Sequence, residues 1–102
     1  MSTYKNRFNK KFNQDKDESN SKAKMTKLTG IPKKVLDEIF FRGVGAFKTA
    51  GPSRPNMTKE QWATARIYAF IMKAYDAVKK GKDKINQDQD LYEKIKEKLK
   101  KI

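Results

Sequence analysis

Hydrophobic residues recur with helical spacing in the first apolar segment of the chain, where they form one face of an amphipathic pattern. Its apolar positions are Ile31, Val35, Leu36, Ile39 and Phe40. Pro32 suits a first helical turn because its missing N–H would lack a partner there anyway. Gly43 is a natural C-terminal stop. The pattern predicts a helix over 31–42, with an apolar extension to 49.

A second helix is predicted over 59–80, where helix formers are dense and apolar positions cover more than half of the circumference. Thr58 and Gln61 match a capping box, in which each side chain satisfies the other residue's backbone N–H. Met57 and Trp62 stand where a hydrophobic staple forms. A helix this apolar is expected at the centre of the fold, packed on two sides.

A third helix is predicted over 91–101, since Asp90 and Glu93 repeat the capping-box pattern just before a narrow apolar stripe. The stripe consists of Leu91, Ile95 and Leu99. No segment shows the alternation typical of a strand. We therefore expect an all-α, small three-helix domain over 28–102, arranged around the second helix.

The first 27 residues have a different composition, rich in Asn, Lys, Ser and Asp. Such a segment buries too little apolar surface to offset its ordering entropy, so 1–27 is predicted to be a disordered basic arm. Aromatic residues recur in it every four positions, at Tyr4, Phe8 and Phe12. Cations stand between them, at Lys5, Arg7, Lys10 and Lys11. The stripe could fold into a partner's groove, stack on unpaired bases or be incidental to a disordered tail.

The net charge of the chain indicates which class of molecule it binds. The chain has 25 Lys and Arg against 12 Asp and Glu, a net charge of +13. The excess covers arm and domain and fades after residue 88. A basic domain with a basic arm favours a polyanion, most commonly nucleic acid, over a purely solubilising role.

Several function classes are disfavoured by what the sequence lacks. There are no cysteines and no histidines, which removes thiolate metal sites and the commonest general base. Asp83, Asp88 and Asp90 share a loop but lack EF-hand spacing and its glycine. We expect no catalytic residues, no metal, no cofactor and no enzymatic activity. Low hydrophobicity also argues against a membrane partner and for a soluble, intracellular protein.

The corner between the first two predicted helices allows two interpretations. It carries four cations near a helix N-terminus, whose free N–H groups favour phosphate. These are Arg42, Lys48, Arg54 and Lys59. Alternatively the corner is a stiff hinge, in which Gly43 and Gly45 permit a tight reversal, Phe47 fills the core and Pro55 delays the next helix. The spacing is not that of a nucleotide-binding loop.

Arg66 is expected to tie the first two helices together by pairing with Asp37 or Glu38. Extending the anion-binding surface is the other interpretation of this residue.

The segment "RGVGAFKTAGPSRPNMTKEQWATARIYAFI", followed by "KDKINQDQDLY", resembles a small uncharacterised domain of tailed-phage and giant-virus proteins. The matching elements are Arg42, Gly43, Gly45, Ala46, Phe47, Arg54, Pro55, Trp62, Ala63, Ala65, Arg66, Phe70, Asp88, Asp90 and Leu91. The resemblance covers about 31–92 and departs at Asn56, where glycine is expected. It implies a viral protein, in host cytoplasm or virion, with a virion- or genome-associated role.

The sequence thus favours a small basic accessory protein that binds nucleic acid, DNA more than RNA, through phosphates and without sequence specificity. The alternative is a virion assembly or adaptor protein whose N-terminal arm docks on a viral or host protein.

Overall fold

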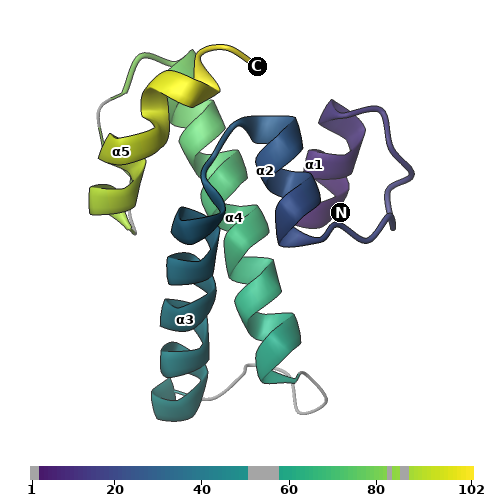
Figure 1. Cartoon of the computed structure of the whole chain (residues 1–102), viewed down its shortest axis with the longest axis vertical. Helices are drawn as coiled ribbons and strands as arrows, with labels where there is room; N and C mark the ends of the chain where they lie inside the picture. Colours follow the sequence, from purple (N-terminus) through teal and green to yellow (C-terminus); the bar gives the residue numbers. More distant parts are fainter. Residues whose placement is uncertain (1–2, 51–57, 83, 86–87) are drawn as a thin grey trace.

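A computed structural model describes residues 3–50, 58–82, 84–85 and 88–102, and all regular structure in these ranges is helical. The helices are α1 (Tyr4–Lys11), α2 (Lys22–Thr29), α3 (Lys33–Ala50), α4 (Lys59–Lys79) and α5 (Gln89–Leu99) (Figure 1). The all-α prediction is therefore confirmed. The predicted count of three helices is too low, because two more lie mainly within the first 27 residues.

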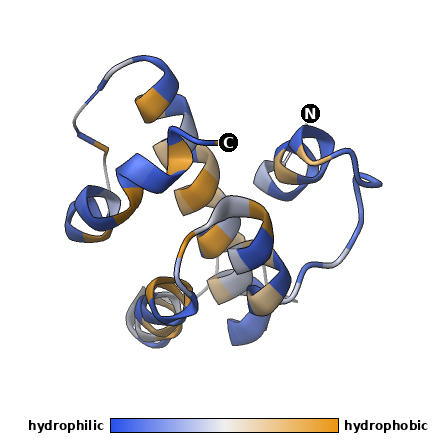
Figure 2. Ribbon diagram, turned by 45° about the horizontal axis from the view of Figure 1, so that its top comes forward, coloured by the Kyte–Doolittle hydropathy of each residue, from blue (hydrophilic) through white to orange (hydrophobic). Residues whose placement is uncertain are grey.

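Helix α4 forms the centre of the fold, as its apolar circumference predicts. It contacts α1, α3 and α5, while α2 packs against α3. Figure 1 shows α3 and α4 side by side, with α1 and α5 on opposite sides of the upper half of α4. Figure 2 shows hydrophobic helix faces turned toward the middle of this bundle. The buried core draws on all five helices.

The segment expected to be disordered contains two helices that pack into the core. Helix α1 starts with a reciprocal capping box between Thr3 and Asn6. The Phe8 ring is fully buried, 5.4 Å from the ring of Tyr68 on α4. The aromatic spacing of four is thus a helix stripe whose partner belongs to the same chain. Helix α2 also crosses the predicted boundary between residues 27 and 28, with Met25 buried.

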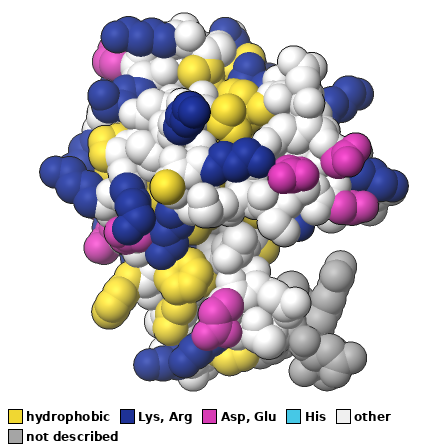
Figure 3. All heavy atoms as spheres, turned by 45° about the vertical axis from the view of Figure 1, so that its right-hand side comes forward, with side chains coloured by type: hydrophobic (Ala, Val, Ile, Leu, Met, Phe, Trp, Pro, Cys, Tyr) yellow, Lys and Arg dark blue, Asp and Glu magenta, His cyan; other side chains and the backbone are white. Residues whose placement is uncertain are grey.

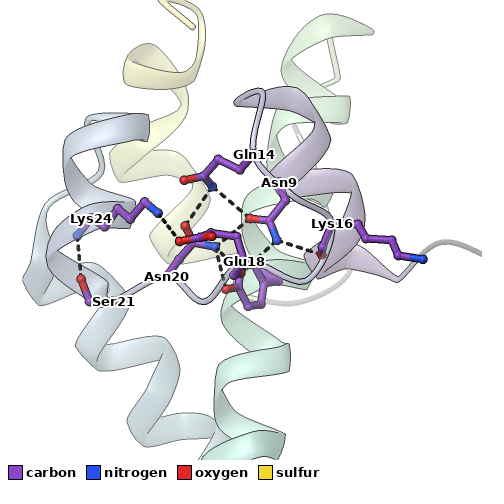
Figure 4. Close-up of polar contacts among 8 residues, drawn as sticks. Asn9, Gln14, Lys16, Glu18, Asn20, Ser21 and Lys24 are labelled. Carbon is purple, nitrogen blue, oxygen red and sulfur yellow. Dashed lines mark hydrogen bonds and ion pairs between the residues drawn. The ribbon is translucent and has the colours of Figure 1, made fainter.

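A network of side-chain amides orders the polar segment between α1 and α2 (Figure 4). Asn9 is fully buried, and its Nδ2 donates to the carbonyl oxygens of Lys16 (2.9 Å) and Glu18 (3.0 Å). Its Oδ1 accepts from Gln14 Nε2 (3.0 Å) and Asn20 Nδ2 (2.8 Å). Because the buried amide is satisfied on both sides, a segment poor in apolar residues still takes a defined path.

Helix α3 continues through both glycines of the expected corner, so the predicted extension to 49 is helical, whereas the predicted stop at Gly43 and the tight reversal there are wrong. Gly43 instead lies at a close approach of α3 to α4, since a Cβ at this position would lie 2.9 Å from the Ala63 Cα. At Gly45 the space is open. Phe47 is half-buried. Arg54, Pro55 and Met57 lie outside the described residues.

The start of α4 agrees with the sequence. Thr58 N–H donates to Gln61 Oε1 at 3.0 Å, and Gln61 N–H donates to Thr58 Oγ1 at 3.1 Å. Trp62 is half-buried one turn later. The helix gives way to a turn at Gly81, whose φ of +69° is easily adopted by glycine.

Candidate nucleic-acid interface

Two groups of charged side chains stand out, and the first is an arginine cluster formed by Arg42, Arg66, Asp88 and Asp90. The Arg42 guanidinium donates to both Asp90 oxygens, at 3.0 and 2.7 Å, and to Asp88 Oδ1 at 2.9 Å. Its Nε also donates to Glu38 at 3.1 Å, within α3. Three carboxylates therefore surround this guanidinium.

Asp88 links three helices through the arginine cluster. Its side chain is 3% exposed and accepts from Arg42 on α3 and from Arg66 on α4, the latter at 3.2 Å. Asp88 stands at the N-cap of α5 with φ of +57°, but its carboxylate makes no cap hydrogen bond. The predicted Asp90–Glu93 capping box is therefore wrong, because α5 starts at Gln89 and Asp88 faces the arginines.

The expected partner of Arg66 is also wrong: the residue does connect two helices, but they are not the first two predicted ones. Asp37 pairs with Lys22 at 3.0 Å and Glu38 with Arg42, so Arg66 pairs with Asp88 and ties α4 to α5. Six of the residues that matched the motif in the sequence lie in or next to this cluster: Arg42, Gly43, Ala63, Arg66, Asp88 and Asp90.

Strong pairing fixes the charges of this cluster. The Arg42 guanidinium lowers the pKa of Asp90 to about 2, and the hydrogen bonds that it donates to Asp90 and Asp88 raise the pKa of Arg42. A phosphate at Arg42 would have to displace a carboxylate. The other described cations of the predicted corner site, Lys48 and Lys59, are exposed and no contact joins them to the cluster.

The second group, which we call the tyrosine face, lies where α1 packs on the C-terminal half of α4. It consists of Tyr4, Arg7, Lys11, Lys73, Tyr75 and Lys79. Lys11 Nζ lies 4.0 Å and Lys79 Nζ 5.2 Å from the centre of the Tyr75 ring. Around the Tyr4 ring, the Arg7 guanidinium carbon lies at 5.5 Å and Lys73 Nζ at 5.7 Å. Each tyrosine is thus flanked by two cations.

Few carboxylates balance the cations of the tyrosine face. Helix α1 has four cations and no acid. Asp76 pairs with Arg7 at 2.8 Å, which is the ion pair that the described residues make on this face. The hydrogen bond from Lys11, with the charges of Lys11 and Lys79, lowers the pKa of Tyr75. Figure 3, which brings the right-hand side of Figure 1 forward, shows Lys and Arg side chains scattered among uncharged ones, with fewer Asp and Glu side chains between them.

Part of the tyrosine face is predicted by the sequence. Arg7, Lys11 and Tyr4 are candidates from the arm, and Lys5 and Lys10 lie on the same helix, half-buried and exposed respectively. Phe8 is buried and unavailable to a ligand, and half-buried Phe12 packs on it with ring centres 4.8 Å apart. The sequence reasoning missed Tyr75, Lys73 and Lys79. Their one local signal is the spacing of four between Tyr75 and Lys79, which places both on one side of a helix.

Two other features are absent from the part of the chain that the structure describes. In it, no three acidic side chains gather as metal ligands would. Nor does any described helix combine the length and apolarity that crossing a bilayer requires.

Comparison with known proteins places the chain in a family. No match to the chain was found among curated proteins or among solved structures. Residues 1–95 match the model of a family described as "Family of unknown function (DUF5824)". This match starts at residue 1, so it includes α1 and α2 together with most of the remaining fold. The chain belongs to this DUF5824 family of unknown function.

Proposed function

We propose that the protein binds nucleic acid without sequence specificity, through phosphate contacts made by the tyrosine face. The observation that supports this best is the concentration of α1 and α4 cations around two half-buried tyrosines, with a single neighbouring carboxylate. Surface cations near one another attract a phosphate backbone because binding releases its condensed counterions.

The two charged groups differ in the partners of their cations, and this difference supports placing the interface on α1 and α4. Arg42 and Arg66 already meet carboxylates, whereas Lys11, Lys73 and Lys79 contact aromatic rings. A cation–π contact is worth about 0.5–1 kcal/mol at an exposed site and about 2 kcal/mol when desolvated, so a phosphate can compete with the rings for these partly exposed lysines. Lys5 and Lys10 extend the same basic helix.

The resemblance to phage and giant-virus proteins gives this proposal its setting. In that setting the protein is a viral, non-enzymatic accessory factor associated with the genome, in the host cytoplasm or in the virion. DNA is the preferred ligand.

The proposal is tested by measuring the Kd for single- and double-stranded DNA and RNA over a series of salt concentrations. Binding should weaken log-linearly with salt. Replacing Lys11, Lys73 and Lys79 with glutamine should reduce the salt slope by about one for each phosphate contact removed.

The matched control replaces Lys94, Lys98 and Lys101 with glutamine, since these exposed lysines lie on or just after α5, across α4 from α1 in Figure 1. The same net charge is removed, and the salt slope should change less. Equal effects of the two triple variants would show that net charge matters and the tyrosine face does not. Absence of binding to all four nucleic acids at low salt would refute the proposed function.

A second candidate is an assembly or adaptor protein that docks on a viral or host protein. The observation that favours it is Phe41 on α3, whose side chain is 78% exposed. Because Phe8 of the N-terminal arm is buried, Phe41 is the better ring for such docking. A partner held this way should be released by Phe41→Ala but retained at high salt.

A further inference from the structure

We propose that the tyrosine face selects single-stranded over double-stranded nucleic acid, with Tyr4 and Tyr75 stacking on unpaired bases while the flanking cations bind the phosphates. This inference rests on the proposed function and adds the class of nucleic acid to it.

The first support is the repetition of one arrangement at two places. Tyr4 comes from α1 and Tyr75 from α4, and each ring has two cations within 6 Å of its centre. Aromatic rings alternating with cations suit a single strand, in which bases and phosphates also alternate. Phosphate binding alone would require the cations but no rings between them.

The second support is the position of the rings in the fold. Both tyrosines are half-buried on helices whose neighbouring residues, such as Phe8 and Ala74, are core. Rings held this way cannot be inserted deep into a duplex, where every base is already stacked and paired. A single strand brings its bases to the surface of the protein, so the same rings can contact them.

The third support is that the ring faces can be vacated at little cost. The lysines over Tyr75 and the arginine beside Tyr4 have long side chains, of which Lys79 and Arg7 are exposed and Lys11 is half-buried. Arg7 can leave the ring of Tyr4 only by weakening its ion pair with Asp76, and a pair this exposed contributes little stability. An incoming base can displace these cations from the rings toward its own phosphate. Lys11 Nζ already lies 4.0 Å from the centre of the Tyr75 ring, so the displaced ammonium stays close to a base stacked there.

The test compares a fluorescein-labelled strand of about 15 thymidines with a matching duplex of about 15 base pairs, by anisotropy with the full chain. A ribose strand of the same length distinguishes DNA from RNA as the source of the unpaired bases. The native protein should bind the single strand more tightly than the duplex. Tyr4→Leu and Tyr75→Leu should each weaken single-strand binding by about 5-fold or more, and duplex binding by less than 2-fold.

The matched control is Phe40→Leu. Phe40 is also half-buried beneath a lysine, with Lys22 Nζ at 4.1 Å from its ring, but Asp37 neutralises that lysine. This variant should bind both probes like the native chain, and circular dichroism checks that all three variants are folded. Equal loss on both probes, or no loss in the tyrosine variants, overturns base stacking and leaves phosphate binding standing. No binding of any probe at low salt refutes the proposed function itself.

Discussion

At the scale of single residues, the two glycines of α3 have opposite surroundings although only Val44 separates them. A Cβ at Gly43 would lie 2.9 Å from the Cα and 3.1 Å from the Cβ of Ala63, and 3.3 Å from the Cδ of Arg66. A Cβ at Gly45 would meet nothing within 4 Å. The contact at Gly43 brings α3 close enough to α4 for Arg42 and Arg66 to share Asp88.

Replacing each glycine with alanine should therefore change stability in opposite directions. Gly45→Ala should gain about 0.5–1 kcal/mol, because alanine lowers the entropy cost of a helix interior. Gly43→Ala should be less stable than Gly45→Ala by about 1–3 kcal/mol, the usual penalty of overpacking against backbone. Urea unfolding of both variants measures this difference. Equal stability of the two would mean that α3 and α4 can separate freely.

The pairing of Asp90 predicts how the stability of the fold changes at acidic pH. Its pKa falls from the usual 3.8 to about 2 because the Arg42 guanidinium stabilises the carboxylate. A depressed pKa in the folded state contributes stability above about pH 3.8, and that contribution is lost as pH falls through about 2. Asp90→Asn should be less stable at neutral pH, and its stability should change less than that of the native chain between these pH values.

Thermal unfolding at several pH values tests this, with Asp17→Asn as control. Asp17 is exposed in the segment between α1 and α2, so its replacement removes one negative charge away from the cluster. Parallel pH curves for the native chain and Asp90→Asn would contradict the assigned role of the Arg42–Asp90 pair.

At the scale of elements, α1 is the helix whose observed structure differs most from its prediction. Its composition is typical of a solvent-exposed arm, but the Phe8 side chain is fully buried in the core. The rings of Tyr68 and Phe12 pack on the Phe8 ring. The hydrogen bonds of Asn9 hold the segment that follows α1 against this helix. A few buried contacts thus hold an otherwise polar helix in place.

Phe8→Ala should accordingly destabilise the protein by about 3–5 kcal/mol, the typical cost of removing a buried phenylalanine. Phe41→Ala is the control, since Phe41 is 78% exposed and its truncation should change stability by less than about 0.5 kcal/mol. Chemical denaturation of the two variants gives the comparison. If Phe8→Ala unfolds like the native chain, α1 does not belong to the cooperative core.

Local patterns explain which elements could be predicted. The predicted 59–80 and the observed Lys59–Lys79 agree because capping, composition and apolar spacing act within one helix. The predicted 91–101 lies two residues late, since Asp88 serves arginines far away in sequence instead of its own helix. The tyrosine face also depends on contacts between residues far apart in sequence. Its α1 cations show in the sequence, but no local signal reveals that α1 packs beside Tyr75.

At the scale of the whole molecule, the net charge of +13 is distributed over a body of only 37 × 30 × 26 Å. The arginine cluster and the ion pairs of α2, α3 and α5 neutralise part of it locally. The tyrosine face carries cations with one paired carboxylate. We therefore expect a polyanion to be attracted unevenly over the surface, and to be attracted by α1 and the C-terminal half of α4.

This charge should also make the fold more stable as salt is added at low concentration. At about 0.01 M salt the screening length is about 30 Å, so like charges across the entire molecule repel one another, whereas at about 0.1 M it is about 10 Å. The exposed ion pairs that salt weakens are worth only about 0–1 kcal/mol each, so relief of repulsion should dominate. Thermal unfolding should show a Tm that rises with sodium chloride over this range. The rise in Tm should be smaller in Lys94→Glu, which lowers the net charge at an exposed position of α5. A Tm that falls with salt would mean that attraction within the ion pairs outweighs the repulsion of the excess cations.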